Sequence, residues 1–143
     1  MKRILSAILI GVMSISMLTV NASAHNNTQG MVVVKDVGGA TKISSLSISS
    51  STAYCDSTYS DDNKSIKSIR GEQTLEKKTA SGSYSAVSGA RWIESSSSAD
   101  LSMFHTKSGL SKGTYRLKTV FKATFNNGKT ETTTVYSLLS TIR

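Results

Sequence analysis

Apolar and polar residues alternate most regularly near the C-terminus, over residues 113–137. Apolar side chains occupy every second position of 115–125, and Thr119 is the one polar residue in that row. This period of two is typical of a β-strand with one buried face. Asn-Asn-Gly follows at 126–128, and Asn-Gly is a strong hairpin signal because both residues tolerate positive φ. The threonine-rich residues 129–137 then predict the returning strand of a long β-hairpin.

Shorter alternating segments recur along the rest of the chain, separated by turn-forming residues. Further strands are predicted over residues 31–34, 42–49, 53–59, 65–77, 84–87, 91–94 and 99–106. About seven strands at roughly ten-residue spacing, with no βαβ pattern, predict an all-β fold. We expect an antiparallel two-sheet sandwich of the immunoglobulin-like kind, and a barrel is the alternative.

The predicted strand over 65–77 departs from a simple apolar row. Ile69, Gly71, Gln73 and Leu75 share one face of it, and glycine and glutamine are poor core residues. We therefore expect a bulge or a shallow part of the sheet near Gly71 and Gln73. A helix over 69–78 is the alternative, which Gly71 and the turn-forming residues after it disfavour.

Residues 1–24 have the pattern of an export signal. A basic dipeptide precedes an apolar segment, and Ala22-Ser23-Ala24 matches a small-residue cleavage site. A membrane anchor is the alternative, but polar residues dilute the apolar segment. We predict a signal peptide over 1–24, a flexible leader with an edge strand over 25–41, and a β-sandwich domain over 42–143. We expect a secreted, extracellular or wall-associated protein whose mature chain does not span a membrane.

Charge favours anionic partners. The formal net charge is +8 at pH 7, and +6 remains once Lys2 and Arg3 leave with the signal peptide. Such a charge attracts teichoic acids, sulfated glycans, lipid headgroups or nucleic acid over a distance, without defining a specific nucleic-acid site. Cys55 is the only cysteine, which excludes an internal disulfide. We interpret it as a small buried hydrophobe, with a reactive thiol as the alternative.

The segment that leads into the long strand carries a further fold signal. In immunoglobulin-like sandwiches, a tyrosine near the start of the penultimate strand hydrogen-bonds back to the backbone a few residues upstream. Tyr115 follows Leu110 and Gly113 and stands at the start of the long strand. The sequence therefore predicts a tyrosine corner at Tyr115.

Three segments together carry a resemblance: ISSLSIS (43–49), IRGEQTLEKKTASGSYSAV (69–87) and GTYRLKTVFKATFNNGKTETTTVYS (113–137). With the export signal, they resemble a group of small secreted proteins of Gram-positive bacteria. That group shares Gly-x-Tyr-Arg-x-Lys, then Asn-Gly-Lys-x-Glu-Thr-x-Thr and Tyr-Ser, near the C-terminus. The resemblance implies an immunoglobulin- or fibronectin-like sandwich and supplies no catalytic residues. Gly71 and Gln73 depart from the apolar residues usual in the equivalent strand.

Basic side chains mark the most specific candidate surface. They occupy outward positions of the long strand and one position beyond its turn: Arg116, Lys118, Lys122 and Lys129. Such a stripe could contact an anionic polymer, with side chains about 6.8 Å apart per two residues. The alternative, which we favour, is that Glu72 and Glu76 on a neighbouring strand pair with these cations across the sheet.

Other candidate chemistry is sparse. Trp92 and Tyr84 could stack on a glycan, although a single tryptophan is more often a core residue. We interpret His105 as a surface or sheet-edge residue, because no nucleophile or orienting acid is evident near it. The acidic residues at 56–62 lack the spacing of a calcium loop and favour a turn. Nucleotide-binding loops, paired zinc-ligand motifs and nucleophile elbows are absent from the sequence.

These observations predict a secreted, non-catalytic β-sandwich protein without a cofactor or metal. We expect a cell-envelope or extracellular binding module whose partner is an anionic wall polymer or another surface protein. A self-associating structural surface protein is one alternative, and a secreted hydrolase is another. The sequence leaves the oligomeric state open.

Overall fold

The computed structural model describes residues 30–35, 39–62 and 65–143, and the predicted signal peptide lies outside them. These residues form strands and turns, and they contain no helix that could cross a membrane. The strands are β1 (Gly30–Lys35), β2 (Ala40–Ser49), β3 (Thr52–Asp61), β4 (Ile66–Lys78), β5 (Tyr84–Ser96), β6 (Asp100–Lys107), β7 (Gly113–Phe125), β8 (Thr130–Tyr136) and β9 (Ser140–Ile142).

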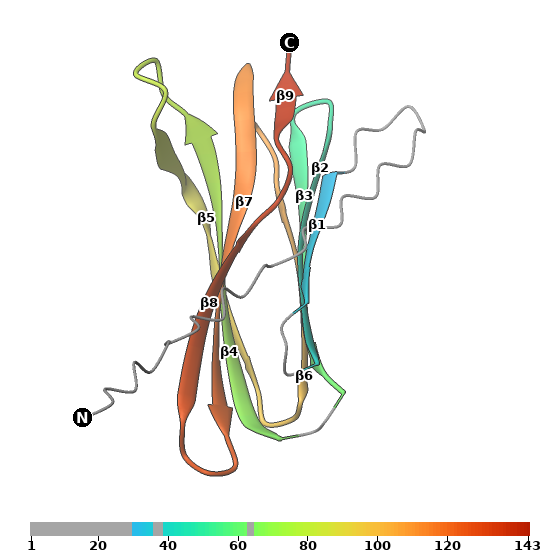
Figure 1. The fold of residues 1–143 in the computed structure, drawn as a ribbon. Helices are drawn as coiled ribbons and strands as arrows, with labels where there is room; N and C mark the ends of the chain where they lie inside the picture. Colours follow the sequence, from blue (N-terminus) through green and yellow to red (C-terminus); the bar gives the residue numbers. More distant parts are fainter. Residues whose placement is uncertain (1–29, 36–38, 63–64) are drawn as a thin grey trace, which may run out of the picture.

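The strands form two antiparallel sheets that face each other (Figure 1). One sheet has the order β1-β2-β3-β6, and the other has the order β5-β4-β7-β8, with β9 also paired to β7. This arrangement confirms the predicted all-β fold and two-sheet sandwich. The predicted helix alternative over 69–78 is wrong, because these residues belong to β4, which pairs with β5 and β7.

The strands differ from the prediction in two places: two predicted strands form one, and one short strand was not predicted. Residues 84–87 and 91–94 are parts of the single strand β5. The register between β4 and β5 shifts between Thr74 and Glu76, and Gly89 adopts a φ of 65° in the same part of β5. A glycine at a bulge lets the strand continue past a local irregularity. The short strand β9 was not predicted.

The β7–β8 hairpin forms where the sequence predicts it, but with a different turn. The amide of Gly128 donates to the carbonyl of Phe125 (2.9 Å), and the amide of Phe125 donates to the carbonyl of Lys129 (2.8 Å). Gly128 has a φ of 82°, whereas Asn126 and Asn127 do not have positive φ. The loop therefore places its glycine in the left-handed region after a turn, rather than using two consecutive positive-φ residues.

Tyr115 forms the predicted tyrosine corner. Its side chain is 1% exposed at the start of β7, and its hydroxyl donates to the carbonyl of Ser111 at 2.5 Å. This bond ties the loop after β6 to the start of β7. The sequence signal was sufficient here because the contact spans only four residues.

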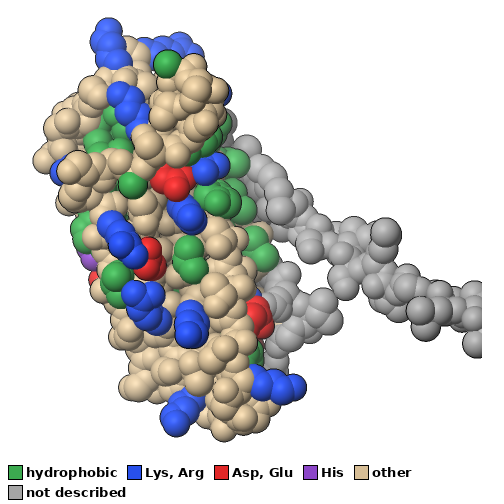
Figure 2. Space-filling view, turned by 90° about the vertical axis from the view of Figure 1, so that its left-hand side faces the viewer, with side chains coloured by type: hydrophobic (Ala, Val, Ile, Leu, Met, Phe, Trp, Pro, Cys, Tyr) green, Lys and Arg blue, Asp and Glu red, His purple; other side chains and the backbone are tan. Residues whose placement is uncertain are grey.

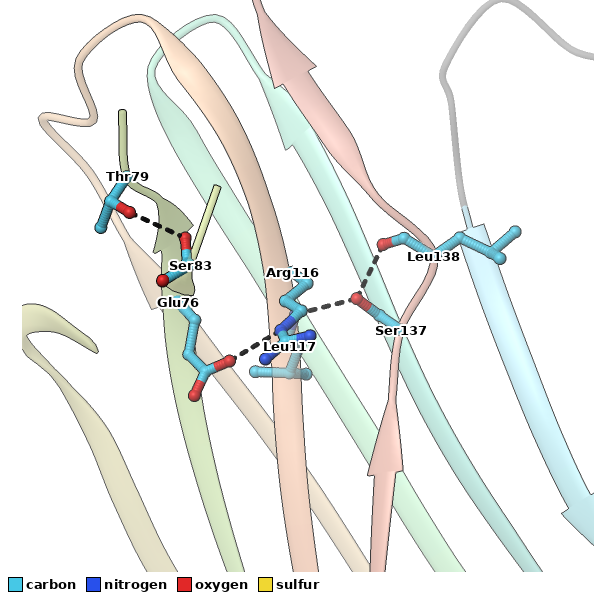
Figure 3. Close-up of polar contacts among 7 residues, drawn as sticks. All are labelled: Glu76, Thr79, Ser83, Arg116, Leu117, Ser137 and Leu138. Atoms are coloured by element: carbon cyan, nitrogen blue, oxygen red, sulfur yellow. Dashed lines mark hydrogen bonds and ion pairs between the residues drawn. The ribbon is translucent and has the colours of Figure 1, made fainter. Parts of the chain in front are cut away.

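Ser137 joins β8 to β9 beside β7. The backbone amide of Leu117 donates to the Ser137 hydroxyl (2.8 Å), and that hydroxyl donates to the carbonyl of Leu138 (2.8 Å), as Figure 3 shows. The side chain thus satisfies a backbone amide that the interrupted ladder leaves without a carbonyl. β9 can therefore continue along β7 and pair Ser140 with Tyr115.

The core consists of two apolar clusters. The first contains Ala40, Tyr59, Ile66, Ile69, Leu101, Met103, Phe121, Ala123 and Val135. The second contains Leu46, Ala53, Cys55, Leu75, Ala90, Leu110, Tyr115 and Leu117. Four buried polar residues, Ser44, Ser57, Gln73 and Thr119, lie on the inward side of β2, β3, β4 and β7 between these apolar positions.

Of the two predictions near Gly71 and Gln73, the shallow sheet is wrong, because both residues are buried, whereas an irregularity does occur just after Gln73, between Thr74 and Glu76 in the pairing with β5. A Cβ atom at Gly71 would lie 2.4 Å from Met103 Sδ and 2.9 Å from Leu101 Cδ2. Glycine is therefore required for β6 to pack closely onto β4. The register between β4 and β7 is regular through Gly71 and Gln73, and its shift lies between Ile66 and Ser68.

Candidate functional site

The outward side of the β5-β4-β7-β8 sheet carries a concentration of basic side chains (Figure 2). Alternation in β7 turns Tyr115, Leu117 and Phe121 inward, so the residues between them face outward. The register places outward residues of β4 and β5 beside them. We call this surface the basic face and define it by Arg70, Arg91, Arg116, Lys118 and Lys122.

Arg116 is fully occupied by neighbouring side chains. Its Nε atom donates to Glu76 Oε2 at 2.7 Å, as Figure 3 shows. Its guanidinium lies 3.8 Å from the ring centroid of Tyr84 and 4.2 Å from that of Tyr136. The favoured alternative from the sequence, pairing with a glutamate of the neighbouring strand, is therefore confirmed for Arg116. The same stack covers the Tyr84 ring with a cation.

Glu72 turns toward β5 rather than toward β7. Its carboxylate lies 2.8 Å from the Arg91 guanidinium and 3.6 Å from the Arg70 guanidinium. The hydrogen bond from Arg91 holds the pKa of Glu72 below its ordinary value, and the charges of Arg91 and Arg70 act in the same direction. The expectation that Glu72 would neutralise lysines of the long strand is therefore wrong.

Lys118 and Lys122 remain without a carboxylate partner among the residues that the structure describes. Across the ladder, Lys118 pairs with Thr74, and Lys122 pairs with Arg70. Like charges in directly opposite positions of a sheet repel each other. The part of the basic face that lies over β7 thus carries uncompensated positive charge.

Hydroxyl groups border these two lysines on the β8 side. Lys118 pairs with Tyr136, and Lys122 pairs with Thr132. Ammonium and hydroxyl groups can all donate hydrogen bonds to phosphate or sulfate oxygens. The arrangement can therefore hold an oxyanion without any acidic side chain competing for it.

Lys129 lies apart from the other predicted contacts, in the β7–β8 turn. Its side chain is exposed, and its backbone amide donates to Asn127 Oδ1 at 3.0 Å. The turn follows Phe125, so Lys129 lies beyond the end of the strand that carries Arg116, Lys118 and Lys122. The structure thus places three predicted residues on one strand face and the fourth at the hairpin end.

Trp92 and Tyr84 do not form a joint stacking platform. Trp92 points inward, where its ring stacks on His105 with centroids 4.9 Å apart and planes 7° apart. Tyr84 lies on the outward side, beneath Arg116. Trp92 is therefore half-buried beside a polar partner, as we expect for a single tryptophan.

His105 belongs to a hydrogen-bonded layer that crosses the interior. Its Nδ1 atom lies 2.8 Å from Gln73 Oε1, and its Nε2 atom lies 3.1 Å from Glu94 Oε1. The Gln73 amide donates to the Ser57 hydroxyl at 2.8 Å. The Thr119 hydroxyl lies 2.7 Å from that of Ser57. Both ring nitrogens of His105 therefore have partners, and the Glu94 carboxylate is an acid beside His105 that the sequence did not reveal.

Every buried side-chain nitrogen and oxygen in the described part of the chain has a hydrogen-bond partner. Ser44 extends the polar layer, with its hydroxyl 3.1 Å from that of Thr119. On the inward side of β2, Lys42 is 1% exposed and pairs at 2.9 Å with Glu131 of β8 in the facing sheet. The interior polar groups therefore bind one another.

Cys55 is buried in the second apolar cluster, as the sequence interpretation expects. Burial raises the pKa of its thiol to about 12, which keeps it protonated and unreactive near neutral pH. Asp61 accepts hydrogen bonds from the amide and the hydroxyl of Ser65, at 3.0 and 2.8 Å. This is the turn geometry that the acidic segment predicts. Within the described ranges, no three His, Cys, Asp or Glu side chains are grouped as metal ligands.

Sequence reasoning missed Arg70 and Arg91 as members of the basic face. Both alternate with glutamates or apolar residues in short segments, and only the sheet register brings them beside β7. Compared with protein-family models, curated proteins and solved structures, the chain matches none of them.

Proposed function

We propose that this protein is a secreted, non-catalytic binding module whose basic face contacts an anionic polymer of the cell envelope. The observation that carries the proposal is the uncompensated charge of Lys118 and Lys122. Phosphate or sulfate groups would supply the acceptors that the surrounding side chains lack.

The cross-strand pair of Arg70 and Lys122 strengthens the proposal. Two like charges in opposite positions destabilise a sheet by a fraction of ~1 kcal/mol; Glu72, 3.6 Å from Arg70, offsets part of this repulsion, and an anion bound at Lys122 reduces the remainder. Ligand binding and fold stability are therefore coupled at this pair. A polyanion should stabilise the protein more than a neutral polymer of the same length.

The spacing of the two lysines suits a repeating ligand. Lys118 and Lys122 are four residues apart on β7, about 14 Å for an extended strand. They point to the same side of the sheet. A flexible polymer with a charged group in every repeat unit can place one group at each ammonium, which multiplies weak contacts.

Two strands of the opposite sheet, β3 and β6, lack this character. The outward residues of β3 and β6 include two acids, Asp56 and Asp100, and no lysine or arginine. Among these described strands, positive charge is therefore concentrated on the basic face. Such asymmetry orients an approaching polyanion toward the basic face.

The proposal includes an immunoglobulin-like fold and export. The order β5-β4-β7-β8 against β1-β2-β3-β6, with the tyrosine corner at Tyr115, supports the first. The signal-peptide pattern of residues 1–24 supports the second. The resemblance to small secreted Gram-positive proteins is consistent with both.

The test is a binding measurement with poly(glycerol phosphate) and, in parallel, with uncharged dextran of similar length. We expect the purified protein to bind the polyphosphate at low salt and to lose affinity steeply as salt rises. The double variant Lys118→Gln/Lys122→Gln should bind about tenfold more weakly, because two surface ion pairs of up to ~1 kcal/mol each are lost.

The matched control removes two positive charges elsewhere. Lys112→Gln/Arg143→Gln changes exposed residues outside the basic face and should change affinity by less than about twofold. Equal losses in the two double variants would show that net charge alone drives binding, and the basic face would then have no specific role. Salt-insensitive binding to dextran would also contradict the proposal.

A further inference from the structure

We infer that a pocket at one end of the sandwich, between β5 and the β6–β7 loop, binds a phosphate or sulfate ester of a small polyhydroxylated molecule. The pocket has a volume of about 360 Å³. This lies at the lower end of the range for small-molecule sites. Its wall is formed by residues of β4, β5, the end of β6, the β6–β7 loop and the start of β7.

Lys77 is positioned in this pocket by three contacts. Its ammonium donates to the Ser111 hydroxyl at 2.7 Å and lies 5.6 Å from the ring centroid of Tyr115. Gly113 leaves room for its side chain, since a Cβ atom there would lie 2.5 Å from Lys77 Cε. Gly113 also has a φ of 145°, so another residue would be strained. A long flexible side chain is thereby held in one place before any ligand arrives, which reduces the entropy lost on binding.

Lys107 supplies a second ammonium from the end of β6. A Cβ atom at Gly89 would lie 3.3 Å from Lys107 Nζ, so the backbone of β5 passes close beside this group. The wall of the pocket contains no aspartate or glutamate. Neither Lys77 nor Lys107 forms an ion pair within the described part of the chain. Two cations that share a cavity without a carboxylate favour an anionic ligand.

The rest of the wall indicates what the anion is attached to. Ser85, Ser88 and Ser108 add hydroxyl groups, which can both donate to an oxyanion and accept from a ligand hydroxyl. Val87 and Leu110 add a small apolar surface. The volume exceeds what a single bare oxyanion fills, so a polyol or monosaccharide that carries the ester fits the pocket better.

This pocket is independent of the basic face. In β4, Lys77 packs over the buried Tyr115 ring, whereas its neighbour Glu76 pairs with Arg116 on the outward side. No residue of the pocket wall belongs to the basic face. Failure of polymer binding at Lys118 and Lys122 therefore leaves this inference standing, and the reverse is also true.

The experiment titrates the ¹⁵N-labelled protein with glycerol 1-phosphate and, separately, with glucose 6-sulfate. Glycerol and glucose serve as uncharged counterparts. We expect saturable shifts of the backbone amide signals of Ser85, Ser88 and Ser108 with at least one ester and none with the uncharged molecules. The ester that binds more tightly identifies phosphate or sulfate as the natural group.

Two variants and one control test the role of the lysines. Lys107→Gln should weaken binding about tenfold, the effect of losing one charge-assisted hydrogen bond. Lys77→Met should do the same while retaining the packing of its stem on Tyr115. Lys112→Gln removes a charge from the same loop outside the pocket wall and should change affinity by less than about twofold.

The inference is overturned if neither ester shifts the pocket amides at about 10 mM, a concentration that detects even weak binding. It is also overturned if Lys107→Gln and Lys112→Gln bind equally well. Lys107→Gln decides the matter if Lys77→Met fails to fold, because the Lys107 side chain forms no ion pair within the described residues and the substitution leaves its backbone pairing with Ala53 in place.

Discussion

Polar residues on the two sides of the β5-β4-β7-β8 sheet differ in whether they have partners. On the inward side, Gln73 and Thr119 are completely buried, and each hydrogen-bonds to Ser57. On the outward side, Lys118 and Lys122 have no acidic partner in the described ranges. Polar residues that satisfy one another hold the structure together, and those that remain unsatisfied at the surface are available to a ligand.

Two successive outward residues of β7, both on the basic face, show the same contrast. Arg116 is stacked between two tyrosines and paired with Glu76, whereas Lys118 faces Thr74. The two residues looked equivalent in the sequence. Their different surroundings assign Arg116 to the scaffold and Lys118 to the candidate site.

The largest expected effect comes from the inward side, with Gln73→Ala. The truncation removes the partner of His105 Nδ1 and one of the two partners of the Ser57 hydroxyl, and it opens a cavity. We expect the free energy of unfolding to fall by about 3 kcal/mol. Urea denaturation followed by tryptophan fluorescence measures this directly, because Trp92 stacks on His105.

Thr74→Ala is the matched control for Gln73→Ala, since Thr74 is the next residue of β4 and faces outward. It should lower the free energy of unfolding by less than about 1 kcal/mol. If both variants were destabilised equally, the inward polar layer would not be a structural element of the core.

A smaller effect is expected when the two kinds of outward cation are compared. Arg116→Ala removes the hydrogen bond to Glu76 and the stack with Tyr84 and Tyr136. We expect a loss of about 2 kcal/mol in the free energy of unfolding. Lys118→Ala should change it by less than about 0.5 kcal/mol.

Chemical denaturation of both variants at one ionic strength makes the comparison. Arg116→Lys sharpens it, because an ammonium cannot stack flat against two rings and should recover only part of the loss. Equal stability of Arg116→Ala and Lys118→Ala would show that Arg116 contributes no more to the fold than Lys118 does.

The smallest expected effect concerns Glu72, whose carboxylate pairs with Arg91 and Arg70 of the basic face. The pKa of Glu72 is lowered in the folded state, chiefly by the hydrogen bond from Arg91. A carboxylate with a depressed folded pKa stabilises the protein above its unfolded pKa, and this contribution disappears as the pH falls through the folded pKa. The stability difference between the native protein and Glu72→Gln should therefore be present at pH 7 and shrink below about pH 4.5.

Thermal unfolding at pH 7, 5 and 3 measures this difference. The expected trend is a convergence of the two melting temperatures toward acid pH. A difference that stayed constant from pH 7 to 3 would show that the carboxylate charge of Glu72 does not contribute to stability.

Strand positions were predictable because they depend on local patterns. The alternation in 113–125 and the tyrosine corner at Tyr115 depend on residues close together in the chain. The role of Gln73 was not predictable, because its partner Ser57 is 16 residues away and His105 is 32 away. Gln73, a residue type unfavourable for a core, lies in the core because its hydrogen-bond partners come from distant parts of the sequence.

The candidate site was predicted in part for the same reason. Arg116, Lys118 and Lys122 were identified because they share one face of a single strand. Which of them had acidic partners depended on the direction of Glu72 and Glu76, and the sequence interpretation was correct only for Glu76. The lysines of the pocket escaped notice because Lys77 and Lys107 are 30 positions apart, and only the packing of β4 near the end of β6 brings them to one pocket.

The sequence by itself determined the all-β class, the β7–β8 hairpin and the positive charge, because these follow from alternation, turn chemistry and composition. Only the tertiary structure decided which polar side chains are satisfied and which are free. Ser44 meets Thr119 across 75 positions, and Lys42 meets Glu131 across 89. Such pairs depend on sheet register and on the packing of two sheets, and no local pattern encodes them.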